Sequence, residues 1–232
     1  MKGLQCTDAN QKYDKIHACA KHFAVHSGPE WNRHEFNAEN IKPRDLHETY
    51  LVPFEALVKE GKVKEVMCAY NRLEGDPCCG SDRLLMQILR QEWGYEGIVL
   101  SDCGAIDDFY REKGHKTHPD AESASAAAVL SGTDLECGSS YKALVESAKK
   151  GLISEKDIDV SVKRLLKARF ELGEMDDPSK VEWTKIPYSV VCSAEHDSLS
   201  LDIARKSMTL LLNKNNILPL KRGGQTIAVM GP

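Results

Sequence analysis

Short apolar runs alternate with amphipathic stretches along the first 174 residues of the chain. Each apolar run is bounded by turn residues and is too short for a buried helix, which favours a buried strand. The predicted strands cover residues 15–23, 64–71, 97–101 and 132–138. Apolar residues at helical spacing predict the helices that follow them, at 44–60, 81–94, 121–130, 140–150 and 154–172.

This alternation predicts an α/β fold with a parallel sheet and right-handed crossovers. A (β/α)8 barrel and a doubly wound sheet both fit it. The barrel is favoured because polar residues follow the carboxyl end of every predicted strand, where barrels place their active sites. These residues are Lys21, His22, Tyr70, Asn71, Asp102, Asp134 and Glu136. Four βα units are half a barrel, so residues 1–174 are interpreted as the C-terminal half of a barrel-type catalytic domain.

The periodic pattern fades over residues 175–192, which we interpret as a linker. Beyond the linker, residues 194–207 predict a helix, 208–212 a strand, and a last strand begins near Thr226. Because the sequence stops as that strand enters a turn, we expect residues 193–232 to be the truncated start of a second domain.

Composition narrows the class of protein. The chain has 232 residues, of which 41% are hydrophobic and 28% charged, with a net charge of -4. This balance predicts a packed domain, and the mixed charges give no nucleic-acid-binding signature. No apolar run reaches the roughly 18 residues of a membrane span, so neither nucleic acid nor membrane is an expected partner. The sequence leaves the oligomeric state open.

The chain contains eight cysteines, and none forms a CxxC pair. A zinc ribbon is therefore disfavoured. Two interpretations stay open at this point. The cysteines are buried free thiols, or some of them form disulfides in an oxidising compartment.

Asp102 is the candidate centre of the chemistry, because a carboxylate at the end of a buried strand must be paired or used. Lys21 and His22 end a neighbouring strand and can donate to hydroxyl groups, which suits a polyhydroxylated ligand. A retaining glycosidase needs such a nucleophile, with a second carboxyl group about 5 to 5.5 Å away. On spacing alone, a generic barrel site fits equally well. The chain lacks GxGxxG, GxxxxGK, HExxH and GxSxG motifs, so no cofactor and no metal is predicted.

Four motifs in order resemble family 3 glycoside hydrolases over residues 19–232. They are Lys21-His22-Phe23 and the segments 66–71, 101–106 and 132–138. The resemblance implies a barrel-type domain followed by an α/β sandwich. It implies that Asp102 is the nucleophile, that Lys21 and His22 hold sugar hydroxyls, and that Tyr70 lies close to the nucleophile. In some xylosidase-like members two cysteines near the sugar pocket are bridged, and the matching positions are Cys103 and Cys137.

The same resemblance sets the expected activity. The motif forms are most similar to members that act on β-xylosides and β-glucosides, so the expected partner is an oligosaccharide or an aryl or alkyl β-glycoside. Most members carry the acid/base glutamate in the second domain, beyond this chain. The 232 residues alone are therefore expected to be inactive, and a non-catalytic carbohydrate-binding fragment is the alternative.

A β-N-acetylglucosaminidase of the same family is a further alternative. That subfamily uses an Asp-His pair in a loop soon after the Lys-His motif. Residues 30–35 read Glu-Trp-Asn-Arg-His-Glu and lack the Asp-Ser-His pattern, so this substrate class is rejected. The complete protein is expected to be periplasmic or secreted rather than cytoplasmic.

Overall fold

The computed structural model describes residues 1, 3–5, 11–224, 226 and 228–230. The chain divides into two units, Met1–Lys185 and Ile186–Pro232. This break falls inside the segment that the sequence predicts to be a linker. The assignment of residues 1–174, 175–192 and 193–232 to two domains and a linker stays a prediction.

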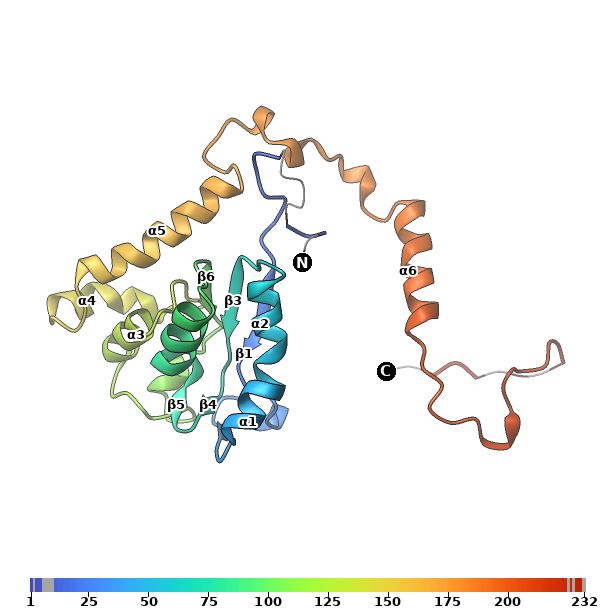
Figure 1. Ribbon diagram of the computed structural model, residues 1–232, viewed down its shortest axis with the longest axis horizontal. Coiled ribbons are helices and arrows are strands. Elements are labelled where there is room, and N and C mark those ends of the chain that lie inside the picture. Colours follow the sequence, from blue (N-terminus) through green and yellow to red (C-terminus); the bar gives the residue numbers. More distant parts are fainter. Residues whose placement is uncertain (2, 6–10, 225, 227, 231–232) are drawn as a thin grey trace. The chain divides into compact units, whose positions relative to one another are not determined.

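A three-stranded parallel sheet, in the order β1-β3-β6, forms the centre of the first unit. Its strands are β1 (Cys19–Phe23), β3 (Glu65–Cys68) and β6 (Ile98–Ser101), and Figure 1 shows them side by side. Val66 lies opposite Ala20 on one neighbour and Val99 on the other. All three side chains are buried, as expected for strands covered on both faces. The α/β prediction is confirmed, and the half-barrel stays a prediction.

Helical segments connect and follow these strands. They are α1 (Pro43–Asp45), a π-helical turn at Leu46–Tyr50, α2 (Val52–Lys59), a π-helix at Arg83–Glu92, α3 (Ala121–Leu130), α4 (Leu144–Lys149) and α5 (Glu155–Glu171). Short 3-10 turns occur at Glu30–Asn32, Cys78–Gly80, Asp107–Phe109, Ser140–Ala143, Pro178–Lys180 and Glu182–Lys185. At the start of α5, Ser154 and Asp157 form a reciprocal capping box.

Phe23, at the end of β1, joins two of these helices to the sheet. Its ring makes edge contacts with Phe54 of α2, at 5.1 Å between centroids, and with Trp93 after the 83–92 helix, at 5.8 Å. Leu85 and Leu89 of that helix are completely buried in the same core. This packing fixes the carboxyl end of β1, where the predicted sugar-binding residues lie.

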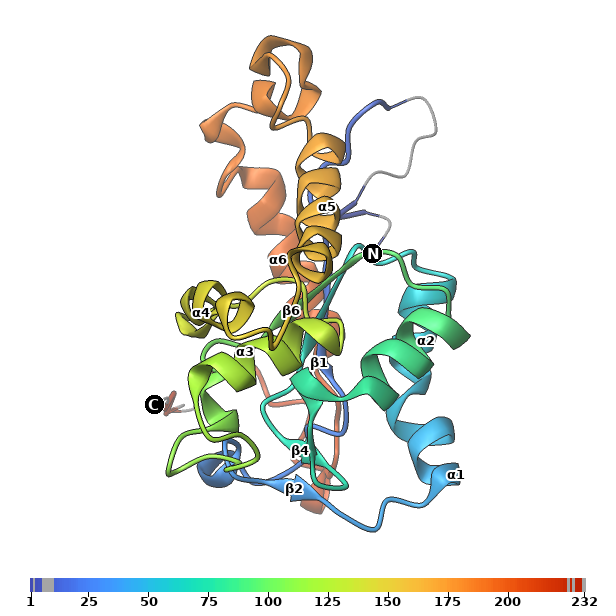
Figure 2. The ribbon, with the colours of Figure 1, turned by 90° about the vertical axis from the view of Figure 1, so that its left-hand side faces the viewer.

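A second, smaller sheet was not expected from the sequence. It contains β2 (Asn37–Ala38), β4 (Arg72–Leu73) and β5 (Asp76–Pro77), with β2 parallel and β5 antiparallel to β4. Two-residue strands are too short to show an alternating pattern. β4 follows β3 after three residues, so this sheet lies beyond the carboxyl end of β3 (Figure 2).

The predicted fourth strand at 132–138 is wrong. The segment runs beside β6 but forms only one isolated parallel bridge, between Leu100 and Leu135. The side chain of Asp134 accepts from the backbone N–H of Val99 at 2.9 Å, which takes a donor away from a regular ladder.

The second unit contains a 3-10 turn at Tyr188–Val190, helix α6 (Ala194–Ser207) and a 3-10 turn at Lys214–Asn216. The predicted helix is confirmed, but residues 208–212 form no strand. An extended segment needs a neighbouring strand, and the described residues of this unit provide none. Of the predicted last strand, residues 225, 227, 231 and 232 lie outside the described residues, and residues 226 and 228–230 form no strand. None of the described helices is both long enough and apolar enough to span a membrane.

Candidate functional site

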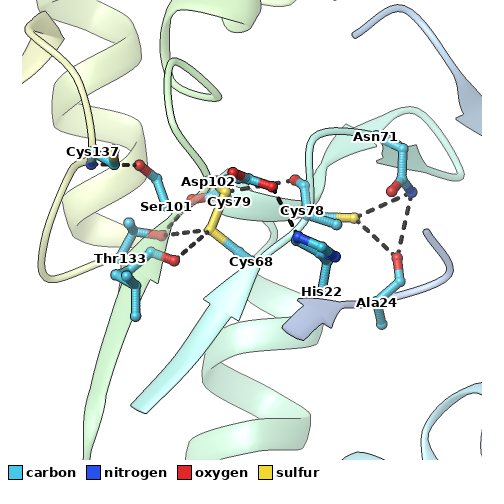
Figure 3. Close-up of a disulfide and its surroundings, with 12 residues drawn as sticks. His22, Ala24, Cys68, Asn71, Cys78, Cys79, Ser101, Asp102, Thr133 and Cys137 are labelled. Carbon is cyan, nitrogen blue, oxygen red and sulfur yellow. Dashed lines mark hydrogen bonds and ion pairs between the residues drawn. A yellow bond between two sulfur atoms is a disulfide. The ribbon is translucent and has the colours of Figure 1, made fainter. Parts of the chain in front are cut away.

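Asp102 directly follows β6, and the fold holds its carboxylate from two sides. The backbone N–H of Cys103 donates to Oδ1 at 2.8 Å. The other oxygen, Oδ2, lies 3.2 Å from Nε2 of His22, and 14% of the Asp102 side chain is exposed. Figure 3 shows the two side chains pointing toward each other. The carboxylate is therefore oriented and largely desolvated.

His22 and Lys21 come from the end of β1, as the sequence predicts. Burial lowers the pKa of His22, and the charge of Asp102 only partly opposes this effect. The imidazole is therefore neutral at neutral pH and can donate from Nε2 to Asp102. Lys21 is exposed at the same strand end, and its charge adds to the lowering of the His22 pKa.

Tyr70, after β3, also lies near Asp102. Its hydroxyl donates to the backbone carbonyl of Cys103 at 2.8 Å. Burial, with the nearby charge of Asp102 and a hydrogen bond to it, raises the pKa of Tyr70 to about 12. The phenol stays protonated and remains a donor beside the carboxylate. The structure thus brings Asp102, His22 and Tyr70 together.

Two disulfides lie beside this group. Cys103 is bonded to Cys137, with 4.4 Å between Cα atoms. Cys68, at the end of β3, is bonded to Cys79, with 5.1 Å between Cα atoms. The resemblance implies the first bridge, but no sequence signal identified the second. Both bridges fix backbone segments that touch Asp102, since the N–H of Asp102 donates to the carbonyl of Cys68 at 3.3 Å.

The structure places three further residues around Tyr70, of which sequence reasoning considered only His34, as a fallback acid/base. The ring of His34 meets the Tyr70 ring edge-on, at 4.5 Å between centroids. The guanidinium of Arg33 lies 5.1 Å from the centre of the Tyr70 ring. Asp108 lies 2.7 Å from Nδ1 of His34. The loops at residues 27–34 and 105–119 are polar in sequence, but no sequence pattern indicates that they contact each other.

Comparison with known proteins now decides the family. Residues 1–168 match the family described as "Glycosyl hydrolase family 3 N terminal domain". The chain belongs to glycosyl hydrolase family 3. The predicted resemblance is thereby confirmed.

The relatives of this family 3 chain are much longer than it is. It is 56% identical over 234 residues to a xylan 1,4-beta-xylosidase of Xylanibacter ruminicola, covering 100% of this chain and 27% of that protein. It is 37% identical over 237 residues to Beta-D-xylosidase 1 of Arabidopsis thaliana, covering 100% of this chain and 30% of that protein.

Solved structures of the family agree with this fold. One is the exo-β-xylosidase XlnD in complex with a xylobiose aziridine activity-based probe. Its TM-score is 0.85 at 30% identity, over 95% of this chain and 29% of that chain. Another is a β-glucosidase from Listeria innocua in complex with isofagomine. Its TM-score is 0.77 at 28% identity, over 88% of this chain and 28% of that chain.

Two carboxylates that the sequence placed on the same rim are structural in this family 3 domain. The Asp134 side chain is fully buried and lies 2.7 Å from both Arg90 and Arg164. Glu136 accepts from the backbone N–H groups of residues 140–141, at 2.8 and 2.6 Å. Asp134 is therefore enclosed by the fold, and Glu136 holds the turn at residues 140–141.

Among the described residues, Asp14, His17 and Glu171 have the spacing of a metal site. They lie near the amino ends of the strands, away from Asp102. The ammonium group of Lys64 lies 2.8 Å from Asp14 and 3.0 Å from Glu171, so a positive charge already balances these carboxylates. We assign no metal to this cluster.

Proposed function

We propose that the complete protein is a retaining, exo-acting β-glycosidase that removes terminal β-linked xylose or glucose, with Asp102 as its nucleophile. The observation that carries the proposal is the Asp102 carboxylate, held by Cys103 and His22 at the carboxyl end of a strand. The xylosidase and glucosidase relatives support the same activity.

The geometry suits a double displacement. An Asp102 oxygen attacks the anomeric carbon, and the leaving-group oxygen takes a proton from an acid/base group, which gives a covalent glycosyl-enzyme. Water then attacks the same carbon, and the acid/base takes its proton, so that Asp102 is released and configuration is retained. Lys21, His22 and Tyr70 would hold the sugar hydroxyls. Lys21 would donate, and the other two would accept, because their own protons go to Asp102 and Cys103.

In this proposal, the acid/base group lies in a part of the enzyme beyond this chain. Three carboxylates near the rim are already engaged, because Asp134 and Glu136 serve the fold and Asp108 is paired with His34. The isolated 232-residue chain is therefore expected to bind saccharide without turning it over. Hydrolysis by this chain alone would instead make His34, with Asp108, the first acid/base candidate.

The nucleophile is tested in the complete enzyme with 4-nitrophenyl β-xyloside and β-glucoside. Asp102→Ala should abolish turnover of both, whereas Asp159→Ala, on an exposed position of α5, should not. A 2-deoxy-2-fluoro-β-xyloside with a good leaving group should add one sugar to the peptide containing Asp102. Wild-type turnover in Asp102→Ala, or a sugar on another residue, would contradict the assignment. 4-Nitrophenyl N-acetyl-β-glucosaminide should not be cleaved.

We also propose that the complete protein is periplasmic or secreted. The bridges Cys68–Cys79 and Cys103–Cys137 support this location, because disulfides form and persist in oxidising compartments. Cell fractionation of the source organism, with thiol labelling before reduction, tests it. Recovery of the protein with all four thiols reduced from the cytoplasmic fraction would refute it.

A further inference from the structure

Asn71 is a polar residue near the carboxyl end of β3 that has no part in the mechanism above. The sequence places it on the rim with the candidate site residues, but the structure buries it completely, at 0% exposure. A fully buried amide does not reach a saccharide. Because buried polar groups are held in place by hydrogen bonds, the partners of Asn71 show what it does.

We propose that Asn71 is a positioning residue for the glycosidase reaction, which fixes the turn after β1 and thereby sets His22 against Asp102. The inference rests on the proposed glycosidase function. It adds a residue that acts on the nucleophile through His22, without touching the substrate.

The neighbours of Asn71 determine how its amide is turned. Nδ2 lies 3.4 Å from the carbonyl oxygen of Ala24 and 3.1 Å from that of Arg72. Because a carbonyl only accepts hydrogen bonds, the NH₂ group must face these two oxygens. Oδ1 then faces Nδ1 of His26, at 3.2 Å. His26 therefore carries its proton on Nδ1 and donates it to Asn71.

The contacts with Ala24 and His26 lie on either side of Val25. Val25 is 4% exposed and has a φ of 59°, in the left-handed region that β-branched residues rarely adopt. Such a conformation persists only where the surrounding structure holds it. Asn71 holds the carbonyl before Val25 and the imidazole after it. Figure 3 shows its amide directed at the Ala24 carbonyl.

The turn at residues 24–26 connects directly to the candidate nucleophile. It follows β1, which carries His22. The ring of His26 packs against the ring of His22, at 5.0 Å between centroids, and Nε2 of His22 lies 3.2 Å from Oδ2 of Asp102. Loss of the Asn71 side chain would release both ends of the turn, and His22 would lose its support. Small displacements of a catalytic group lower the rate strongly.

The test is a double-mutant cycle in the complete enzyme, with the 2,4-dinitrophenyl β-glycoside of the sugar that the wild type cleaves faster. This leaving group departs readily, so slow variants stay measurable. Asn71→Ala should lower kcat/KM about tenfold, since it releases two supports of the turn. In a His22→Ala background the same change should lower kcat/KM by less than about twofold. A residue that acts through His22 has no effect once His22 is gone.

Cys78→Ala is the matched control. Cys78 is also 0% exposed, and its thiol donates to the same Ala24 carbonyl at 3.5 Å. A thiol is a weak donor, and its removal leaves the hydrogen bond between Asn71 and His26 in place. Cys78→Ala should therefore lower kcat/KM by less than about twofold.

An unchanged kcat/KM in Asn71→Ala would overturn the positioning role, and so would an equal fall in Cys78→Ala. If Asn71→Ala does not fold, His26→Phe takes its place in the cycle, because it keeps the ring and removes the Nδ1 donor. The proposed function fails separately, if the wild-type enzyme cleaves neither nitrophenyl β-xyloside nor nitrophenyl β-glucoside. Wild-type turnover, with equal effects of the substitution in the two backgrounds, refutes the positioning role alone.

Discussion

Asp134→Asn isolates the charge of a carboxylate that the fold surrounds with donors. Oδ2 of Asp134 accepts from the N–H of Val99 at 2.9 Å and from Arg90 at 2.7 Å. Oδ1 accepts from Ser161 at 3.0 Å and from Arg164 at 2.7 Å. The asparagine has the same shape but only one oxygen. Whichever way its amide turns, one guanidinium faces an NH₂ group.

The size of the effect follows from the burial of the two arginines. The Arg90 side chain is 7% exposed and that of Arg164 is 25% exposed. Loss of one partner from a buried ion pair costs about 3–5 kcal/mol, because the remaining charge is left uncompensated. The amide should turn its oxygen toward Arg90, the more buried of the two. Arg164 can then recover part of its hydration, so we expect the lower end of this range, about 3 kcal/mol.

Hydrogen-exchange mass spectrometry of the complete enzyme measures this effect locally, where a global unfolding curve would mix several domains. Amides of β6 and α5 should exchange about a hundredfold faster in Asp134→Asn. Glu146→Gln is the matched control. It neutralises a surface partner of Lys149 whose side chain is 55% exposed, and such pairs contribute at most about 1 kcal/mol. Equal exchange in the two variants would refute the structural role of Asp134.

Two further predictions concern the Cys103–Cys137 bridge and the pH dependence of stability. Cys103→Ala with Cys137→Ala opens a bridge across 34 residues, which should cost up to about 4 kcal/mol. It should also slow nitrophenyl β-xyloside turnover, because the Tyr70 hydroxyl donates to Cys103; unchanged thermal stability and turnover would contradict this. Burial lowers the pKa of His115 to about 4, so the unfolded chain binds the extra proton and stability falls as pH drops from about 6.5 to 4. His115→Phe should remove about 3 kcal/mol of that loss of stability. Urea unfolding midpoints of the wild type and the variant at pH 7 and 4.5 test this. An equal shift of the midpoint in the two proteins would disprove it.

Local signals in the sequence predicted most of the first unit. The strands β1, β3 and β6 come from short apolar runs that alternate with amphipathic helical stretches, so their pattern is easily recognised. The capping box at Ser154 likewise lies within four residues of sequence. The small β2-β4-β5 sheet shows no such pattern, because each of its strands has only two residues.

Long-range contacts limited how much of the site the sequence could predict. Each motif identified the residues at one strand end, and the parallel strands brought His22 to Asp102 as expected. The His34–Asp108 pair joins residues 74 positions apart, through two loops whose polar residues look ordinary in sequence. The Cys68–Cys79 bridge was equally hidden, because eight cysteines allow many pairings.

Asp102 and Asp134 show why position at a strand end does not by itself identify a catalytic group. In the sequence both are carboxylates that precede a cysteine and a glycine by a few residues. Asp134 has four donors, two of them guanidinium groups, so its lone pairs are committed to the protein. Asp102 has one backbone N–H, one neutral imidazole and the Tyr70 hydroxyl close to it, and part of its side chain stays exposed. Only the second carboxylate can be reached from outside, so its exposure and the charge of its partners separate the candidate nucleophile from the structural carboxylate.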